Sequence, residues 1–290
     1  MTLPPGIRLL RPAQWIKNTF VLLPAFFAAR LDDSTIVLKV LMAFVAFSLT
    51  ASFIYIFNDW ADREKDRRHP RKKNRPLASG AISVRAAFLI GCLLLLLSLP
   101  VAAMLKLNFL YILLLYIGIN LAYSTWLKHL AIVDVTIIAL GFLLRVFAGG
   151  IVAAVPISHW LIVMTFLLAM ILGLSKRRSE FLLQQADIPT RPSLSGYNLA
   201  FIDQAMTLMT AVTIVAYLMY TLSEEVIGRI GSNQLYFTSF FVIIGILRYL
   251  QLSIVFERTD SPTKVLWTDR FLQVIILGWI AVFGWLLYGG

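Results

Sequence analysis

A long apolar run that ends in a cluster of acidic residues decides the fold. Residues 34–57 read STIVLKVLMAFVAFSLTASFIYIF, and they are followed by Asn58-Asp59-Trp60-Ala61-Asp62-Arg63-Glu64-Lys65-Asp66. A helix needs about 20 consecutive apolar residues to cross the hydrocarbon core of a bilayer. The run therefore predicts a transmembrane helix whose end carries several carboxylates.

The composition extends this prediction to the whole chain. Of the 290 residues, 59% are hydrophobic and 14% are charged, whereas soluble domains average about 45–50% and about 25%. A soluble globular enzyme is therefore excluded. We expect an all-α integral-membrane bundle of nine transmembrane helices, in one domain over residues 1–290. The nine apolar segments are Lys17–Leu31, Ser34–Phe57, Ile82–Leu105, Leu107–Leu127, Ala131–Ala154, Ile157–Leu174, Asp203–Ser223, Leu235–Phe256 and Asp269–Tyr288.

Positive charge is distributed unevenly among the loops. The chain has 26 Lys and Arg against 15 Asp and Glu, a net charge of +11. With nine spans, nineteen of these cations fall on one side of the membrane and three on the other, and cations favour the cytoplasmic side. We expect a multi-pass protein of the cell inner (plasma) membrane, with the N-terminus in the cytoplasm and the C-terminus outside. The excess of positive charge predicts that the protein interacts with anionic lipids of the lipid bilayer or with anionic substrates. Nucleic acid is not expected as a partner.

The acidic cluster has the spacing of a metal site. At about 100° per residue, one quadrant of a helix would hold four oxygen-bearing side chains, those of Asn58, Asp59, Asp62 and Asp66. Carboxylates at this spacing repel each other, whereas Mg²⁺ favours one or two carboxylates together with substrate phosphates. We expect Asn58, Asp62 and Asp66 to bind Mg²⁺. Asp59 would assist, so that all three aspartates serve catalysis; a solvated charged loop is the alternative.

A basic loop follows the acidic cluster. Residues 69–76 read HPRKKNRP, and Pro76 favours an extended conformation at Arg75. We expect this loop to fold back over the carboxylates. Because a guanidinium can bind a phosphate through two hydrogen bonds, Arg75 is a candidate phosphate contact. Attraction to anionic lipid is the alternative for the loop cations.

The order of these motifs resembles that of a known family. Asn58-Asp-x-x-Asp62-x-x-x-Asp66 followed by Arg75-Pro-Leu-x-x-Gly80 is similar to the UbiA-type prenyltransferase superfamily, membrane enzymes that bind a Mg²⁺-diphosphate substrate in a helical bundle. The resemblance covers essentially the full chain and implies an active site at the cytoplasmic side. It also implies phosphate-binding groups in Arg11-Pro-x-Gln-Trp-Ile-Lys17-Asn18 and Tyr123-Ser-x-x-Leu-Lys128. The candidate substrate-binding residues from these motifs are Lys17, Asn18, Tyr123 and Lys128.

The chain departs from the aromatic-acceptor enzymes of that superfamily in one region. Those enzymes carry a second acidic motif, Asp-x-x-x-Asp, where this chain reads Gly173-Leu-Ser-Lys-Arg-Arg-Ser-Glu180. With Leu144-Arg145-x-x-Ala-Gly-Gly150 and Ser193-Leu-x-x-Tyr197, the region resembles a branch of phosphoribosyltransferases that act on decaprenyl phosphate. This resemblance implies 5-phosphoribosyl diphosphate as the donor, a polyprenyl phosphate as the acceptor and Mg²⁺ as the cofactor.

Two sets of charged residues in the later spans extend the candidate site. Lys176, Arg177 and Glu180 share a helix face, whereas Arg178 points away. That face would bind a phosphate directly, or would anchor the helix at the interface. Arg145 lies in a predicted span, eleven residues after Asp134 and within about 20° of its direction. Because charged groups in a span face a polar cavity or a partner, we expect Arg145 to bind the ribose phosphate or to pair with an acid.

Two other functions stay open from the sequence. An aromatic-acceptor prenyltransferase that uses a polyprenyl diphosphate would need the missing second acidic motif. An ion-coupled membrane transporter would place its binding residues near the midplane on broken helices, whereas these polar residues gather at one membrane face. The sequence sets neither the length of the lipid nor the oligomeric state, for which a homo-oligomer is one alternative.

Overall fold

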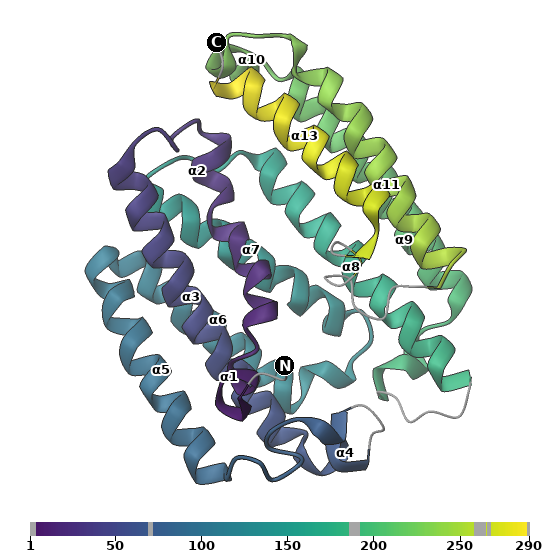
Figure 1. Ribbon diagram of the computed structural model, residues 1–290. Helices are drawn as coiled ribbons and strands as arrows, with labels where there is room; N and C mark the ends of the chain where they lie inside the picture. Colours follow the sequence, from purple (N-terminus) through teal and green to yellow (C-terminus); the bar gives the residue numbers. More distant parts are fainter. Residues whose placement is uncertain (1–3, 69–71, 186–191, 258–264, 266–267, 289–290) are drawn as a thin grey trace. The chain divides into compact units, whose positions relative to one another are not determined.

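The computed structural model describes residues 4–68, 72–185, 192–257, 265 and 268–288, and the regular elements within them are helices (Figure 1). The chain divides into two compact units. Unit 1 comprises Met1–His129 and Gly141–Ile157, and unit 2 comprises Leu130–Leu140 and Ser158–Gly290. Helix α7 (Val133–Ala153) begins in unit 2 and continues in unit 1. The single domain over residues 1–290 stays a prediction.

Unit 1 is built around the long helix α3 (Ser34–Ala61). Packed against α3 are α5 (Val84–Leu105), α6 (Leu107–Thr125), α1 (Pro5–Leu10) and the 3-10 helix η1 (Pro12–Val21). The short elements of the unit are α2 (Leu23–Phe27), α4 (Arg63–Arg68), η2 (Lys72–Asn74) and η3 (Leu127–His129). Phe47 of α3 and Phe109 and Leu113 of α6 are fully buried in its core. The core thus fixes η1 and α6 against α3, and these three elements carry the predicted site residues Lys17, Asn18, Asn58, Asp59 and Tyr123.

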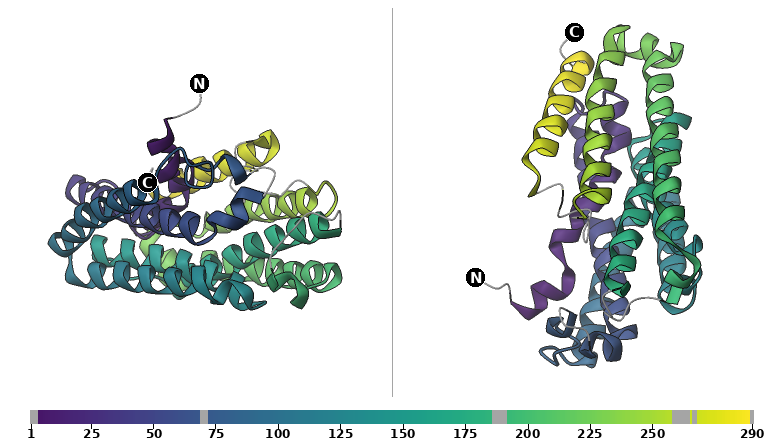
Figure 2. Two further views of the ribbon diagram at one scale, coloured as in Figure 1. Left: turned by 90° about the horizontal axis from the view of Figure 1, so that it is seen from below. Right: turned by 90° about the vertical axis from the view of Figure 1, so that its right-hand side faces the viewer.

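Unit 2 contains two helix pairs. Helix α8 (His159–Gln185) packs against α9 (Leu199–Leu222), and α11 (Ser239–Ile254) packs against both α9 and α13 (Arg270–Tyr288). Figure 2 shows α9 and α11 as long helices, which can be found by their green colours. The short elements of the unit are η4 (Pro192–Gly196), α10 (Glu224–Ile230) and η5 (Gln234–Thr238).

Capping residues set where several of the helices begin. The Asp33 side chain accepts hydrogen bonds from the backbone N–H groups of Thr35 and Ile36 at the start of α3. Ser83 caps α5 through the Ala86 N–H, and Asn198 caps α9 through the Phe201 N–H. These side chains satisfy donors that the first helical turn leaves unpaired. The sequence therefore encodes these helix starts locally.

The described residues contain eight helices that are long and apolar enough to cross a membrane, and each overlaps a predicted span. The helix that begins at His159 extends to Leu183, beyond the predicted end at Leu174. Each of the eight is predominantly apolar, and several expose large apolar side chains. On α5, Leu89 is 72% exposed and Leu96 is 69% exposed. Such exposure is unfavourable in water but suits a helix that faces lipid. The prediction of an all-helical membrane bundle is confirmed by these features.

The first predicted span, Lys17–Leu31, is not a continuous α-helix. It falls on the end of η1 and on the five-residue α2. Pro24 has no N–H, so it cannot bond to the carbonyl four residues earlier and interrupts the helix ladder. Eight of the nine predicted helices are thus present as long apolar helices within the described residues, and a ninth crossing by the η1–α2 segment stays a prediction.

Candidate active site

The acidic motif lies at the junction of α3 and α4 in unit 1. Helix α3 ends at Ala61, Asp62 is its C-terminal cap, and α4 begins at Arg63. The single helix predicted over the motif is thus interrupted at Asp62. Backbone hydrogen bonds from Asp62 N to Asn58 O (2.9 Å) and from Asp66 N to Asp62 O (2.8 Å) nevertheless keep the helical spacing across the junction.

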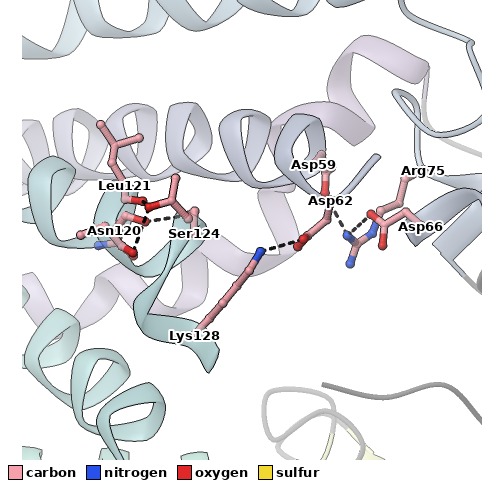
Figure 3. Close-up of polar contacts among 10 residues, drawn as sticks. Asp59, Asp62, Asp66, Arg75, Asn120, Leu121, Ser124 and Lys128 are labelled. Atoms are coloured by element: carbon pink, nitrogen blue, oxygen red, sulfur yellow. Dashed lines mark hydrogen bonds and ion pairs between the residues drawn. The ribbon is translucent and has the colours of Figure 1, made fainter. Parts of the chain in front are cut away.

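Each aspartate of the motif is paired with a cation of unit 1 (Figure 3). Arg75 Nη1 donates to Asp59 Oδ1 at 3.0 Å and to Asp66 Oδ2 at 2.6 Å. Lys128 Nζ donates to Asp62 Oδ1 at 2.7 Å. The expected return of the basic loop onto the carboxylates is confirmed by the Arg75 contacts. Two candidate phosphate contacts, Arg75 and Lys128, therefore lie at the candidate metal site.

Arg11 is a third cation at the acidic motif. Its guanidinium forms an ion pair with Asp59 and lies 5.2 Å from the ring centroid of Tyr55. The backbone of Arg11 adopts the left-handed conformation with φ 51°, which costs a non-glycine residue about 1–2 kcal/mol. This turn between α1 and η1 directs the side chain toward α3. Burial lowers the pKa of the guanidinium, while the charge of Asp59 opposes that shift.

The segment that carries Arg75 is fixed by hydrogen bonds to backbone carbonyls. Arg63 Nε donates to Leu77 O at 3.3 Å, and Arg67 Nε donates to Ala78 O at 3.2 Å. Both arginines belong to α4, so this helix holds the returning segment in place. Residues 69–71 of the basic loop lie outside the described residues.

The predicted magnesium ligands Asn58, Asp62 and Asp66 supply oxygen atoms, the donors that Mg²⁺ prefers. The Asn58 side chain is half-buried and makes no hydrogen bond within the described residues. In the same part of the chain, no group of three or more His, Cys, Asp or Glu side chains converges as a metal site. The oxygen donors of these three residues fit Mg²⁺ by their chemistry. For them to bind the ion, Arg75 and Lys128 would have to release the carboxylates.

A second cationic site in unit 1 surrounds Arg145 of α7. Arg145 is 4% exposed, and its guanidinium donates to Asn18 Oδ1 (2.8 Å), the Tyr116 hydroxyl (3.0 Å) and Gly141 O (2.5 Å). The ring of Phe47 lies 4.9 Å from the guanidinium carbon. Arg145 forms no ion pair within the described residues. The neutral partners satisfy its hydrogen bonds and the aromatic rings offset part of its charge, but no carboxylate of the described residues neutralises this buried ion.

Lys17 and Asn18 of η1, two candidate substrate-binding residues, lie at this second site. Asn18 is buried, and its Nδ2 donates to Ser48 Oγ at 2.9 Å while its Oδ1 accepts from Arg145. Lys17 is half-buried and makes no hydrogen bond or ion pair within the described part of the chain. Burial, and then the charges of Arg145 and Arg11, lower the pKa of Lys17 to about 8. An anion bound here would relieve the repulsion among these cations.

In unit 2, Arg177 is buried and paired with two carboxylates. Its Nε lies 2.7 Å from Asp134 Oδ2, and its Nη1 forms an ion pair with Glu180. The Tyr197 hydroxyl donates to Asp134 Oδ1 at 2.8 Å, and Ser193 Oγ donates to Asp134 Oδ2 at 3.1 Å. Burial and the hydrogen bond to Asp134 raise the pKa of Tyr197. The predicted contacts Arg177 and Glu180 thus have partners within the protein.

The last two predicted substrate contacts, Lys176 and Tyr123, lie on different helices. Lys176 of α8 is half-buried, as is Tyr123 in the last turns of α6. Arg178 pairs with Asp203 at 2.8 Å and donates to Ser253 O at 3.1 Å. The two arginines therefore contact different groups, which confirms that Arg178 points away from the face of Arg177.

The chain matches proteins of one family over most of its length. The model of the UbiA prenyltransferase family matches residues 19–275. The chain belongs to the UbiA prenyltransferase family. This UbiA-family chain is 32% identical to the decaprenyl-phosphate phosphoribosyltransferase of Mycolicibacterium smegmatis, over 97% of the chain and 92% of the relative. It is also 32% identical to the protein of that name from Mycobacterium tuberculosis, over 96% of the chain and 92% of the relative.

A solved structure shows the same fold. The UbiA homolog from Archaeoglobus fulgidus bound to GPP and Mg²⁺ superposes with a TM-score of 0.70 and is 22% identical, covering 98% of this chain and 99% of that one. The UbiA-family assignment and the apolar helices together identify a multi-pass membrane protein.

Two site residues were not among the individual candidates: Arg11, which only begins the predicted phosphate-binding motif that ends at Asn18, and Tyr116. Arg11 lies 48 residues from Asp59 along the chain, and the sequence between them gives no signal of their contact. Tyr116 is separated from Arg145 by 29 residues. A signal existed for Tyr116, because it continues a polar face of its span at a spacing of four residues through Asn120 to Ser124.

Proposed function

We propose that this protein transfers the 5-phosphoribosyl group from 5-phosphoribosyl 1-diphosphate to a polyprenyl phosphate of the decaprenyl type and releases diphosphate. The observation that carries the proposal is the buried Arg145 with its neighbour Lys17, two cations that no carboxylate compensates within the described residues. A donor with a phosphate in addition to its diphosphate supplies the missing negative charge. The names of the two mycobacterial relatives support the same donor and acceptor classes.

The acidic motif would hold the diphosphate end of the donor. Asn58, Asp62 and Asp66 would bind Mg²⁺, with Asp59 assisting. Bound Mg²⁺ supplies neutralisation of the negative charge that develops on the leaving diphosphate. Arg75 and Lys128 would transfer their hydrogen bonds from the carboxylates to the diphosphate oxygens. The bonds formed with the diphosphate are charge-assisted, like the carboxylate bonds that they replace.

The second cationic site would hold the other end of the donor. Lys17 would bind the 5-phosphate, and Arg145 would add its charge while Asn18 fixes the orientation of the guanidinium. An oxygen of the acceptor phosphate then bonds to C1 of the ribose as the bond from C1 to the diphosphate oxygen breaks. Diphosphate leaves with the electron pair. A phosphate monoester is largely ionised at neutral pH, so the attack requires no general base.

The basic face of α8 would position the acceptor phosphate. Lys176 is the candidate for direct contact on this face, and Tyr123 of unit 1 stays a candidate substrate contact. The ion pairs of Arg177 with Asp134 and Glu180 support a positioning role for Arg177 and Glu180. This differs from the direct contact expected from the sequence. The acceptor's apolar tail would lie in the bilayer of the inner (plasma) membrane, with the N-terminus of the protein in the cytoplasm and the C-terminus outside.

Transfer of label from donor to lipid tests the proposed function. Purified protein is incubated with Mg²⁺ and radiolabelled 5-phosphoribosyl diphosphate, with and without polyprenyl phosphate, and the organic phase is counted. We expect label in the lipid fraction that depends on the acceptor. Its absence, with prenyl transfer from a polyprenyl diphosphate to an aromatic acceptor in the same preparation, would replace the proposal with the aromatic-acceptor activity.

Two aspartate variants test the metal assignment. Asp62→Ala and Asp66→Ala should each abolish turnover, because each removes a ligand of the proposed metal site. Glu64→Ala is the matched control, since Glu64 is an exposed acid of the same segment that pairs with Arg67. Full activity in both aspartate variants would exclude these residues as ligands of an essential metal ion.

A further inference from the structure

Helix α6 carries a row of polar side chains on one face. Tyr116, Asn120 and Ser124 follow one another at intervals of four residues, so they point within about 80° of each other. At about 1.5 Å per residue, Tyr116 and Ser124 lie about 12 Å apart along the helix axis. Asn120 therefore occupies the middle of the row.

The row starts at one charged site of unit 1 and leads along α6 toward the other. At one end, the Tyr116 hydroxyl accepts a hydrogen bond from Arg145. Beyond the other end, Lys128 lies in η3, four residues after Ser124, and pairs with Asp62 (Figure 3). All of these groups belong to unit 1. A ligand with one anionic group at each site would cross the region of Asn120.

The Asn120 side chain has one free acceptor. Its Nδ2 donates to the backbone oxygen of Tyr116 at 2.8 Å. Because a backbone oxygen can only accept, this contact fixes the nitrogen toward the helix and leaves Oδ1 facing away from it. Oδ1 has no hydrogen-bond partner within the described residues, and the side chain is half-buried. Ser124 differs, because its hydroxyl already donates to the Asn120 backbone oxygen at 2.6 Å.

We propose that Asn120 is a specificity-determining residue that accepts a hydrogen bond from a ring hydroxyl of the donor's ribose. This inference rests on the proposed function and names a residue outside the acidic and basic motifs. In the donor, the 5-phosphate and the diphosphate lie on opposite sides of the sugar ring, and the 2- and 3-hydroxyls belong to that ring. Asn120 supplies a neutral acceptor between the two charged sites. A carboxylate in its place would accept the same bond but would repel both phosphate groups.

Donor analogues that lack one ring hydroxyl test this assignment. The full donor and its 2-deoxy and 3-deoxy analogues are compared by kcat/KM as substrates and by Ki as competitors. The proteins are the wild type, Asn120→Leu and Asn120→Ala. In the wild type, removal of the recognised hydroxyl should cost about 5- to 100-fold, the range for leaving one buried polar partner unpaired. In both variants kcat/KM for the full donor should fall to about the value for the deoxy analogue, so that the preference disappears.

Thr125→Val is the matched control for these variants. Thr125 lies on the same helix, is exposed, and bonds to the backbone oxygens of Leu121 and Ala122. It should keep the wild-type preference. The thermal midpoint of each protein shows whether it is folded.

The possible outcomes separate this inference from the proposed function. A wild type that transfers no label from the full donor overturns the proposed function. A wild type that transfers label while both Asn120 variants retain its preference overturns the role of Asn120 alone. An equal loss of activity on all three donors assigns Asn120 a structural role and likewise overturns the inference.

Discussion

Raising the pH from 7 to 9 should weaken donor binding through the ionisation of Lys17. Burial and the charges of Arg145 and Arg11 lower the pKa of Lys17 from 10.5 to about 8. The protonated fraction then falls from about nine tenths at pH 7 to about one tenth at pH 9. If the ammonium group binds the 5-phosphate of the donor, kcat/KM for the donor falls about tenfold over this interval. A lysine with a pKa of 10.5 would stay almost fully protonated at both values.

The assay measures initial rates at limiting donor and saturating acceptor between pH 6.5 and 9.5. Lys17→Arg is the control, because a guanidinium stays protonated throughout this range and should give a flat profile. The second ionisation of a phosphate monoester lies near pH 6, so the charge of the donor changes little over most of the range. Identical profiles for the wild type and Lys17→Arg would refute the role of Lys17, and so would a wild-type inflection above pH 10 in an extended scan.

Two further predictions concern the packing that holds the sites together. Asp134→Leu should lower the free energy of unfolding by about 3 kcal/mol, because it removes one carboxylate from the buried Arg177, and adding Arg177→Met should restore part of the loss in thermal unfolding. A double variant no more stable than Asp134→Leu would contradict this account. Gly149→Ala should reduce both thermal stability and donor affinity, because the added Cβ would overlap the Val21 backbone oxygen at the end of η1. Unchanged donor KM in that variant would show that the position of η1 does not matter for binding.

The features that depend on local pattern could be predicted from the sequence. Apolar runs of about 20 residues require the backbone to satisfy its own hydrogen bonds in lipid, so they predict helices directly. The run Ser34–Phe57 corresponds to most of α3, and the i,i+4 bonds through Asp62 preserve the spacing assumed for the acidic motif. The return of Arg75 onto this motif followed from the proline after it.

The features that depend on long-range contact could not be predicted in this way. Asn18 and Arg145 are 127 residues apart, and Asp134 and Tyr197 are 63 residues apart. Helical periodicity orients a side chain on its own helix, but it does not select the partner across the bundle. The helical wheel thus placed Arg177 on a face with Glu180, but did not reveal that Asp134 also pairs with it. The same limit applies to the broken first span, where tertiary packing holds η1 on α3.

The cations of the two candidate sites in unit 1 fall into two groups that favour different ligands. Arg75 and Lys128 have carboxylate partners, so their charges are already compensated and a metal-bound diphosphate would exchange one set of pairs for another. Arg145 and Lys17 have no such partners within the described residues. A substrate whose one anionic group is a diphosphate would occupy the first group and leave the second uncompensated. A donor with a phosphate at each end compensates both, which is why the second group favours phosphoribosyl transfer over prenyl transfer to an aromatic acceptor.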